Sequence, residues 1–465
     1  MKNSVSFDKL YDDVVTKGYD FGTGSWAVVN QDITMEMDEY GAYHAVSKKN
    51  SNNFTTEELN ILKQVCLSTS DKNEDDISKM LYKEIPHIKY DKQLGYYSDL
   101  FVGHVKEGKY RENASSGGLG TWILKELLEK KYVDGVIHVI ETDNKNRLFE
   151  YGISRSIDDI VNGSKTRYYP VEYSDVMSKI KKTPGRYAII GLPSYIMEIR
   201  LLMENDPIIK ERIKYTVGLV CGHQKTAKYA DFLAWQCGIQ PGSLKKINFR
   251  KKLDNEPASS YAVEVTGIVD GEIKTITKKM RDLRGGDWGQ GAFKVRASDF
   301  TDDVYNETAD ITLGDAWLPN YTEDSKGNNI VIIRNQIIQE LVYSGIADGR
   351  LQLDKVDENV IKKSQASHYR HTHDELAYRL YKKEQMKIWH PQKRVSSSNK
   401  LSFVRKRIQD QRAIIADMTS EYYYEAVKRD DLSYFFEKID PQVLAYRKLY
   451  KIKRIINKLK KVIGI

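Results

Sequence analysis

Apolar runs and helical patterns alternate along the middle of the chain. A helical spacing over 121–132 is followed by a strand pattern over 134–142, and short apolar strands recur at 187–191 and 215–221. Short apolar runs separated by helices are typical of a sheet that is covered on both faces. The pattern therefore predicts a layered α/β (α+β mixed) core with a mixed sheet.

The regions beside these elements show other patterns. Residues 245–280 alternate polar and apolar positions around an Asp270-Gly271 pair, which predicts an antiparallel hairpin. From about residue 366 the chain is helical and highly charged. We therefore divide the chain into an N-terminal region over 1–90, a core over 91–365 and a helical C-terminal region over 366–465.

The composition is that of an ordinary soluble protein. The chain has 465 residues, of which 40% are hydrophobic and 30% charged. No apolar run reaches the roughly 18–20 residues of a membrane-spanning helix, and no signal-peptide pattern is visible at the N-terminus. Three cysteines are too few for a disulfide framework and indicate a reducing compartment. We therefore expect a cytoplasmic protein.

The net charge of +8 is concentrated at the C-terminal end. Residues 441–465 contain eight Lys and Arg residues and no Asp or Glu, so the preceding part of the chain is neutral overall. A protein whose main domains bind nucleic acid usually has a large positively charged surface. The charge distribution therefore excludes a general polyanion binder.

The segment 443–465 places apolar and basic side chains on separate stripes of a predicted helix. The apolar stripe contains Ile452, Ile455, Ile456, Leu459, Val462 and Ile463. Basic amphipathic helices are typical of membrane surfaces, where each Lys or Arg near anionic lipid contributes about 1 kcal/mol. We rank the inner membrane surface first as the partner of 443–465 and packing on the protein itself second. Nucleic acid comes last, because the stripe is too apolar for a phosphate-tracking arm.

A loop of small residues, Arg111-x-x-x-Ser115-Ser116-Gly117-Gly118, precedes the first of these helices. Small residues let backbone N–H groups approach a ligand, and a helix N-terminus favours an anion. A phosphate or pyrophosphate is therefore expected here, with Arg111 available for a bidentate contact. A tight turn with serine caps explains the same residues.

A second loop, Gly191-Leu192-Pro193-Ser194, follows the strand at 187–191. Ligands of open α/β sheets bind at the carboxyl ends of the strands, which is where this loop falls. The alternative is a plain strand-to-helix turn with Ser194 as its cap.

Cys221, His223 and Asp315 also follow predicted strands. A cysteine with a histidine two residues on supplies a nucleophile, a proton donor or a metal ligand, but a buried cysteine is equally a small apolar side chain. A zinc site needs more Cys and His than this stretch supplies. Asp315, after Gly314, is placed to accept a hydrogen bond from a ligand, although turn chemistry explains it as well.

In order and spacing these motifs resemble the beta-subunit family of coenzyme F-420 (deazaflavin)-reducing hydrogenases and dehydrogenases, from about residue 15 to about residue 380. The matching stretches are Arg-x-x-x-Ser-Ser-Gly-Gly (111–118), Val-Asp-Gly-Val (133–136), Gly-Ser-Lys (163–165), Gly-Leu-Pro-Ser (191–194), Leu-Val-Cys-Gly (219–222), Phe-Arg-x-Lys (249–252) and Asp-Ile-Thr-Leu-Gly-Asp-Ala-Trp (310–317). Together they form a specific signal, although no single stretch does.

The resemblance implies a bound flavin, usually FAD, with FMN as the alternative. The residues that would line it are Arg111, Ser115, Ser116, Gly117, Gly118, Lys165, Gly191, Pro193 and Ser194. Cys221, His223 and Asp315 would then lie near the reactive face of the flavin, as proton donor or hydrogen-bond partners of the ring.

The cysteine pattern of the family is missing. Members often begin with Cys-x-x-Cys-x-x-Cys-x-x-x-Cys-Pro, and the corresponding positions here hold Asp20, Thr23, Trp26 and Asn30. A later Cys-x-x-Cys is replaced by residues 296–299. A 4Fe-4S cluster needs about four thiolates. We therefore expect a degenerate ferredoxin-like N-terminal segment with no iron–sulfur cluster and no other metal.

The resemblance also suggests a reaction and a setting. A flavin without clusters still passes a hydride between two small molecules that bind in turn, and many relatives occur with polysaccharide biosynthesis proteins. We expect a flavin-dependent reductase of a bacterial surface polysaccharide or its precursor, at the inner face of the membrane. Its substrate would be a glycan or lipid-linked sugar, and its hydride donor NAD(P)H or reduced deazaflavin. The rivals are a non-catalytic scaffold of a glycan assembly complex and a glycan-modifying transferase that reuses the flavin cleft.

Overall fold

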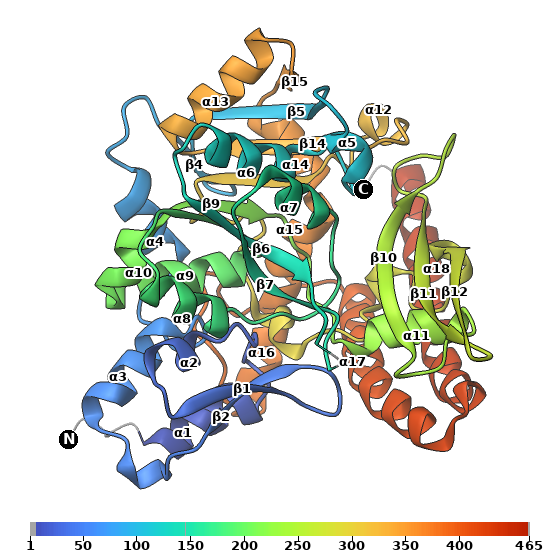
Figure 1. The fold of residues 1–465 in the computed structure, drawn as a ribbon. Helices are drawn as coiled ribbons and strands as arrows, with labels where there is room; N and C mark the ends of the chain where they lie inside the picture. The colour runs from blue at the N-terminus through green and yellow to red at the C-terminus, as the bar shows by residue number, and fades with distance from the viewer. Residues whose placement is uncertain (1–5, 145, 464–465) are drawn as a thin grey trace.

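The computed structural model describes residues 6–144 and 146–463 and is built around an eight-stranded mixed sheet (Figure 1). The strand order is β15-β5-β14-β13-β9-β8-β6-β7. In chain order the strands span Asp99–Val105 (β5), Gly135–Glu141 (β6), Phe149–Ser154 (β7), Tyr187–Gly191 (β8), Ile213–Leu219 (β9), Ile311–Asp315 (β13), Asn329–Ile333 (β14) and Leu351–Lys355 (β15). The expected mixed α/β architecture is confirmed.

The four central strands run parallel to one another. β6 pairs with β8, β8 with β9 and β9 with β13 in parallel register. The outer strands β7, β14, β5 and β15 pair antiparallel with their neighbours. Parallel strands occur almost only where both faces are covered, which is why their sequences read as continuous apolar runs.

Helices cover both faces of the sheet. On one face α6 (Leu119–Glu129) and α13 (Gln336–Ala347) share a hydrophobic cluster with apolar side chains of the strands. On the other face α9 (Pro193–Asn205) belongs to a larger cluster that includes Ile137 of β6 and Ile189 of β8. The sheet is thus the middle of three layers.

A three-stranded antiparallel sheet stands beside the central one (Figure 1). Its strands are β10 (Leu244–Lys252), β11 (Tyr261–Val269) and β12 (Glu272–Lys279). Asp270 and Gly271 both adopt positive φ, as a two-residue turn of this kind requires, and Val269 pairs with Glu272. The predicted hairpin is confirmed.

The N-terminal region contains short helices and a small hairpin rather than a long element. Its helices are α1 (Phe7–Tyr11), α2 (Ser25–Val29), α3 (Thr56–Val65) and α4 (Glu74–Tyr82), and its strands are β1 (Ile33–Met37) and β2 (Tyr43–Ser47). Two further strands, β3 (Lys89–Asp91) and β4 (Gly95–Tyr97), lead into the central sheet. α3 packs against α9, so the region lies on the outer side of that helix.

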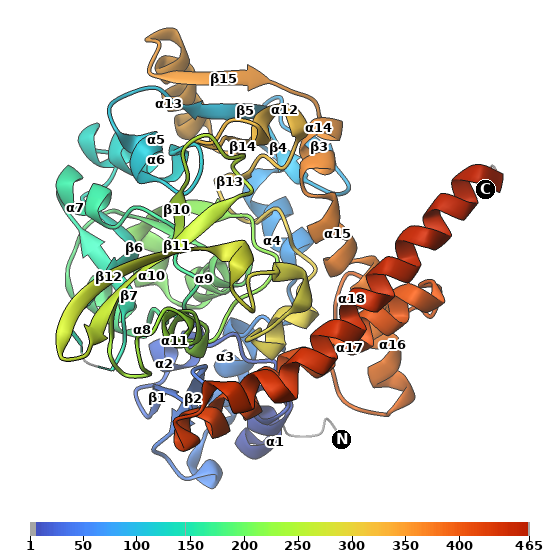
Figure 2. The ribbon, with the colours of Figure 1, turned by 90° about the vertical axis from the view of Figure 1, so that its right-hand side faces the viewer.

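The C-terminal region is helical, as expected. It comprises α15 (Ala366–Thr372), α16 (Asp374–Gln385), α17 (Phe403–Arg429) and α18 (Leu432–Ile463), after the short helix α14 (Glu358–Ser364). α17 and α18 form the most extensive helix pair of the chain. Figure 2 shows the last turns of α18 projecting away from the body.

The exposed end of α18 bears on the prediction for 443–465. Ile452 (46% exposed), Ile455 (50%) and Leu459 (55%) are open to solvent, so this part of the helix does not pack on the protein itself. Residues 464–465 of the segment lie outside the described residues. No helix in the described part of the chain is long and apolar enough to cross a membrane.

Candidate functional site

The loops singled out in the sequence meet at one edge of the central sheet. The parallel strands β6, β8, β9 and β13 all end there, and β8 and β9 end side by side, with Gly191 opposite Gly218. Since β5 is antiparallel to β14, its carboxyl end reaches the same edge. This is the place where α/β sheets bind their ligands.

A pocket at this edge brings two of the predicted loops together. Pro193 and Ser194 line it together with Cys221 and His223. The other lining residues are Phe21, Leu192, Gly222, Gln224, Ser298, Thr301 and Asp303. Segments far apart in sequence therefore meet here, including Phe21 from the N-terminal region.

The loop after β8 is not the serine-capped turn that was the alternative interpretation of its sequence. α9 begins at Pro193 with Leu192 as its N-cap, and no side chain caps it. Ser194 thus lies inside the helix, and its expected role as a cap is wrong. Proline at the first helical position costs no hydrogen bond, because that N–H has no partner inside the helix.

Cys221 and His223 lie in the loop after β9, because that strand ends at Leu219, earlier than expected. Burial raises the pKa of the Cys221 thiol to about 12, so the sulfur keeps its proton at neutral pH. Burial and the positive charges of Lys225, Lys294 and Arg412 hold the pKa of His223 well below its usual value. The His223 ring is therefore neutral, and it stacks on Trp288 at 4.7 Å between centroids.

Asp315 is held by a buried arginine that the sequence did not assign to the site. Arg250 Nη1 donates to Asp315 Oδ2 at 2.6 Å, and the Arg250 side chain is only 6% exposed. The carboxylate raises the pKa of Arg250 above its usual value against the opposing effect of burial, so the guanidinium stays charged. Trp317 and Tyr261 place their rings 5.7 and 5.1 Å from the guanidinium.

Two hydrogen bonds and one close contact connect the backbone of Asp315 with the loop of Cys221. Gln365 Nε2 donates to the Asp315 carbonyl at 2.6 Å, and Gln365 Oε1 lies 2.9 Å from His368 Nδ1. A β-carbon on Gly222 would come within 2.8 Å of the His368 ring, so this ring lies directly on the Gly222 backbone. These contacts therefore bring Asp315 into the neighbourhood of the pocket.

The Ser-Ser-Gly-Gly loop is used mostly to hold the edge of the sheet together. Arg111 pairs with Asp324 and donates to the Gly327 carbonyl, and Ser116 Oγ donates to the Asn328 carbonyl at 2.9 Å. Gly118 is the N-cap of α6 and has a positive φ, so the serine caps weighed in the sequence are absent. Arg111 is thus already bound to a carboxylate.

Two further contacts tie this loop to distant segments. Ser115 Oγ accepts a hydrogen bond from Thr166 N–H at 3.0 Å, which places the loop of Lys165 beside it. Lys252 Nζ donates to the Arg111 carbonyl at 2.6 Å and to the Ser116 carbonyl at 3.0 Å. Burial, with Arg111 and Arg250 nearby, lowers the pKa of Lys252 to about 7.

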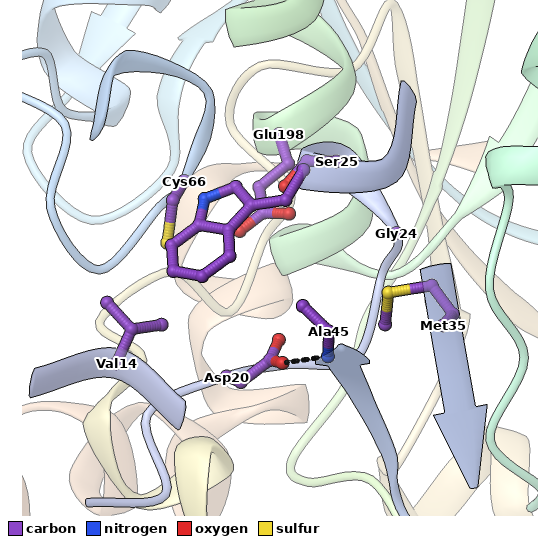
Figure 3. Close-up of a pocket in the computed structure, with 9 residues that line it drawn as sticks. Val14, Asp20, Gly24, Ser25, Met35, Ala45, Cys66 and Glu198 are labelled. Atoms are coloured by element: carbon purple, nitrogen blue, oxygen red, sulfur yellow. Dashed lines mark hydrogen bonds between the residues drawn. The ribbon is translucent and has the colours of Figure 1, made fainter. Parts of the chain in front are cut away.

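A second pocket is lined by Asp20 and Trp26, two of the positions that the sequence resemblance aligns with cluster cysteines. Figure 3 shows Asp20, Cys66 and Glu198 around it, with Asp20 accepting from the Ala45 N–H. The buried Trp26 ring donates to the Leu62 carbonyl at 2.9 Å. Within the described residues no group of three or more His, Cys, Asp or Glu side chains is arranged to hold a metal ion.

Two buried nitrogen atoms at the edge of the sheet bear on whether a flavin fits there. His223 Nε2 and Arg250 Nε have no hydrogen-bond partner among the described residues. Buried polar atoms normally find partners, so an unpaired one indicates a missing water or ligand. Arg250 Nε–H suits an acceptor such as a ring oxygen or phosphate of a flavin, and His223 Nε2 suits an acceptor or a donor of the ring according to its tautomer.

Comparison with known proteins identifies the family to which the chain belongs. Residues 100–178 match the N-terminal part of the coenzyme F420 hydrogenase/dehydrogenase beta subunit, and residues 185–359 match its C-terminal part. A solved chain of the F420-reducing [NiFe] hydrogenase complex from Methanosarcina barkeri is 17% identical, with a TM-score of 0.47, over 63% of this chain and 96% of that chain. A search of the curated proteins finds no match. Since the two family matches together cover more than half of the sequence, the chain belongs to the coenzyme F420 hydrogenase/dehydrogenase beta-subunit family.

Proposed function

We propose that this chain is a flavin-dependent reductase that works without iron–sulfur clusters. The observation that carries the proposal is the pocket shared by the loops after β8 and β9, at the ligand-binding edge of a family fold of oxidoreductase subunits. FAD, or alternatively FMN, would lie across the loops at 115–118 and 191–194. The flavin would supply hydride transfer, which no side chain of this site provides.

The side chains of the site would orient the bound groups and manage one proton. Cys221 holds its proton on Sγ at neutral pH and would donate it. Neutral His223 offers Nε2 for a hydrogen bond to the ring, and its stacking on Trp288 fixes the ring plane. Arg250 holds the Asp315 carboxylate in place and has Nε free within the described residues.

The substrate would be a bacterial surface polysaccharide or its lipid-linked precursor, with NAD(P)H or reduced deazaflavin as the hydride donor. The chain would be cytoplasmic, at the inner membrane surface, and the exposed end of α18 supports the contact with a membrane. Its apolar side chains Ile452, Ile455 and Leu459 recur at helical spacing, and Lys451 and Arg454 flank them. Apolar residues would enter the interface while the basic ones contact anionic headgroups.

Flavin binding is tested by a pair of glycine variants. A β-carbon on Gly117 would lie 2.7 Å from the Gly103 carbonyl, so Gly117→Ala displaces the loop. A β-carbon on Gly120, one turn further, meets only ordinary contacts at 3.6 Å and beyond. In a titration with FAD followed by flavin fluorescence, we expect the first variant to lower the affinity at least about tenfold and the second to leave it unchanged. Equal affinities, or no binding by the wild type, would contradict the proposal.

Membrane association is tested by flotation with vesicles containing phosphatidylserine. Truncation after residue 450 is expected to abolish flotation, whereas Ile273→Ser is not, although Ile273 on β12 is the more exposed side chain at 74%. Equal flotation of the truncated and full chains would contradict the membrane proposal and leave the flavin proposal standing.

A further inference from the structure

Five basic side chains gather where the C-terminal helices pack against the core. Lys225 follows the pocket loop, Lys294 precedes the 3-10 turn Arg296–Phe300, Arg379 lies on α16, and Arg405 and Arg412 lie on α17. We call these five residues the basic cluster. Their side chains are at most 10% exposed, and α16 and α17 lie outside the matched family ranges.

The basic cluster is not neutralised by the carboxylates around it. Asp299 contacts Lys294 and Arg379, and Glu375 contacts Arg405 and Arg412. Lys225 has no carboxylate within ion-pairing distance among the described residues. With Lys225 protonated, the five bases outnumber the two carboxylates that contact them by three charges in a buried place. Burying unpaired charge is costly, so such an excess indicates an absent anion.

Lys225 shows the lack of negative charge most clearly. Its Nζ donates to the Ala292 carbonyl at 2.5 Å and lies over the rings of Trp288 and Tyr229, at 4.4 and 4.9 Å. Burial together with the charges of Lys294 and Arg412 holds the pKa of Lys225 well below its usual value. An anion beside it would restore its charge.

Arg412 and Lys294 both lie beside the Gly291 backbone. A β-carbon on Gly291 would make only ordinary contacts, at 3.6 Å from the Arg412 carbonyl and at 3.9 Å from Arg412 Nε and Lys294 Cε, so a methyl-sized group fits there without displacing either side chain. Arg412 Nε is buried without a hydrogen-bond partner among the described residues, and so is His223 Nε2. Both nitrogen atoms are available to a ligand.

We propose that the basic cluster, with His223, binds a pyrophosphoryl group. A diphosphate carries two to three negative charges, which matches the excess, whereas a single carboxylate does not. Arginine suits phosphate oxygens because its planar donors make bidentate contacts. His223 belongs both to this site and to the pocket of Cys221, so a group attached to the diphosphate would reach the candidate reacting side chains. The pyrophosphate belongs either to a diphosphate-linked sugar substrate or to FAD itself.

Inorganic pyrophosphate is the first probe, measured by calorimetry on the full chain without added flavin. We expect binding by the wild type and at least tenfold weaker binding by Lys225→Met and Arg412→Gln. Methionine has the length of lysine and suits the apolar surroundings of Lys225, so this variant should fold and gain thermal stability without ligand. Arg284→Gln is the control, since Arg284 pairs with Asp440 at the surface. No binding by the wild type, or equal binding by Lys225→Met, would overturn the proposal.

Competition then separates the two sources. If FAD displaces pyrophosphate while FMN does not, the diphosphate is that of the cofactor. If UDP-glucose displaces pyrophosphate and FAD does not, the site takes a diphosphate-linked substrate. If none of the three competes, the site holds only the free inorganic anion and the proposal fails. Because the first measurement uses no flavin, its outcome is independent of the proposed reductase activity.

Discussion

Replacing Glu198 by glutamine should change the pH dependence of stability. Glu198 lies on α9, lines the pocket of Figure 3 and is 3% exposed. It accepts hydrogen bonds from Thr23 Oγ1 and, at 2.9 Å, from the Leu67 N–H. Burial raises its pKa from 4.5 to about 7 against the opposing effect of these bonds.

The sign follows from the raised pKa. The folded chain binds this proton more tightly than the unfolded chain, so the stabilisation is complete below about pH 4.5 and is lost as the pH rises through 7. At 1.36 kcal/mol per pKa unit, the shift corresponds to about 3 kcal/mol lost above pH 8. Glutamine mimics the protonated acid, so Glu198→Gln should match the wild type near pH 5 and exceed its stability by about 3 kcal/mol at pH 8.5.

Urea unfolding of both proteins between pH 5 and 8.5 measures this difference. Glu204→Gln is the matched control on the same helix. Glu204 pairs with Lys72 and Lys210, and their hydrogen bonds hold its pKa below the usual value. Its replacement should therefore lower the free energy of unfolding most at high pH, where Glu204 is ionised. A difference between Glu198→Gln and wild type that does not change with pH would show that Glu198 does not bind its proton more tightly in the folded chain.

Three further outcomes are expected. Cys221→Ala should lower the rate at which substrate reoxidises the reduced flavin at least tenfold, because it removes the proton on Sγ. Cys237→Ala, at the end of α11 (Lys228–Gln236), should leave this rate unchanged. Equal rates for the two variants would exclude Cys221 as the proton donor. Asp315→Asn should destabilise the fold by about 3–5 kcal/mol, because it leaves the buried Arg250 without its carboxylate; a urea midpoint unchanged from wild type would contradict a charged pair. Lys252→Met should weaken FAD binding at pH 6 more than at pH 8.5. The pKa of Lys252 is about 7, so at the higher pH the wild-type side chain has already lost its charge. A loss of FAD affinity that is the same at both pH values would argue against a role for the charge.

The elements of the core could be predicted because their sequences are locally consistent. β14 is five buried residues in a row, and the hairpin turn has the two residues that tolerate positive φ. Helix starts were less predictable. Serine was expected to cap α6 and α9, but Gly118 and Leu192 occupy those positions. In α6 the Asn329 side chain accepts from the Leu119 N–H in place of a cap.

The candidate site was predictable only in part. The carboxyl-edge rule brought the loops of Ser194 and Cys221 to one pocket. It did not foresee that Arg111 would pair with Asp324, more than two hundred residues away, or that Arg412 would approach His223. Contacts of that range depend on how whole layers pack, which neither spacing nor periodicity specifies. Arg250 and Lys252 could have been assigned to the site from the sequence, because they belong to the Phe-Arg-x-Lys stretch that matches the family.

Flavin binding and redox activity are best measured together, by anaerobic photoreduction of the purified full chain. After incubation with FAD or FMN and removal of free flavin, we expect the absorbance bands of one bound flavin per chain. These bands should bleach on illumination with EDTA as the electron donor and return when an oxidised substrate is added. A chain that retains no flavin from either solution, at any ratio of cofactor to protein, would show that it is not a flavoprotein.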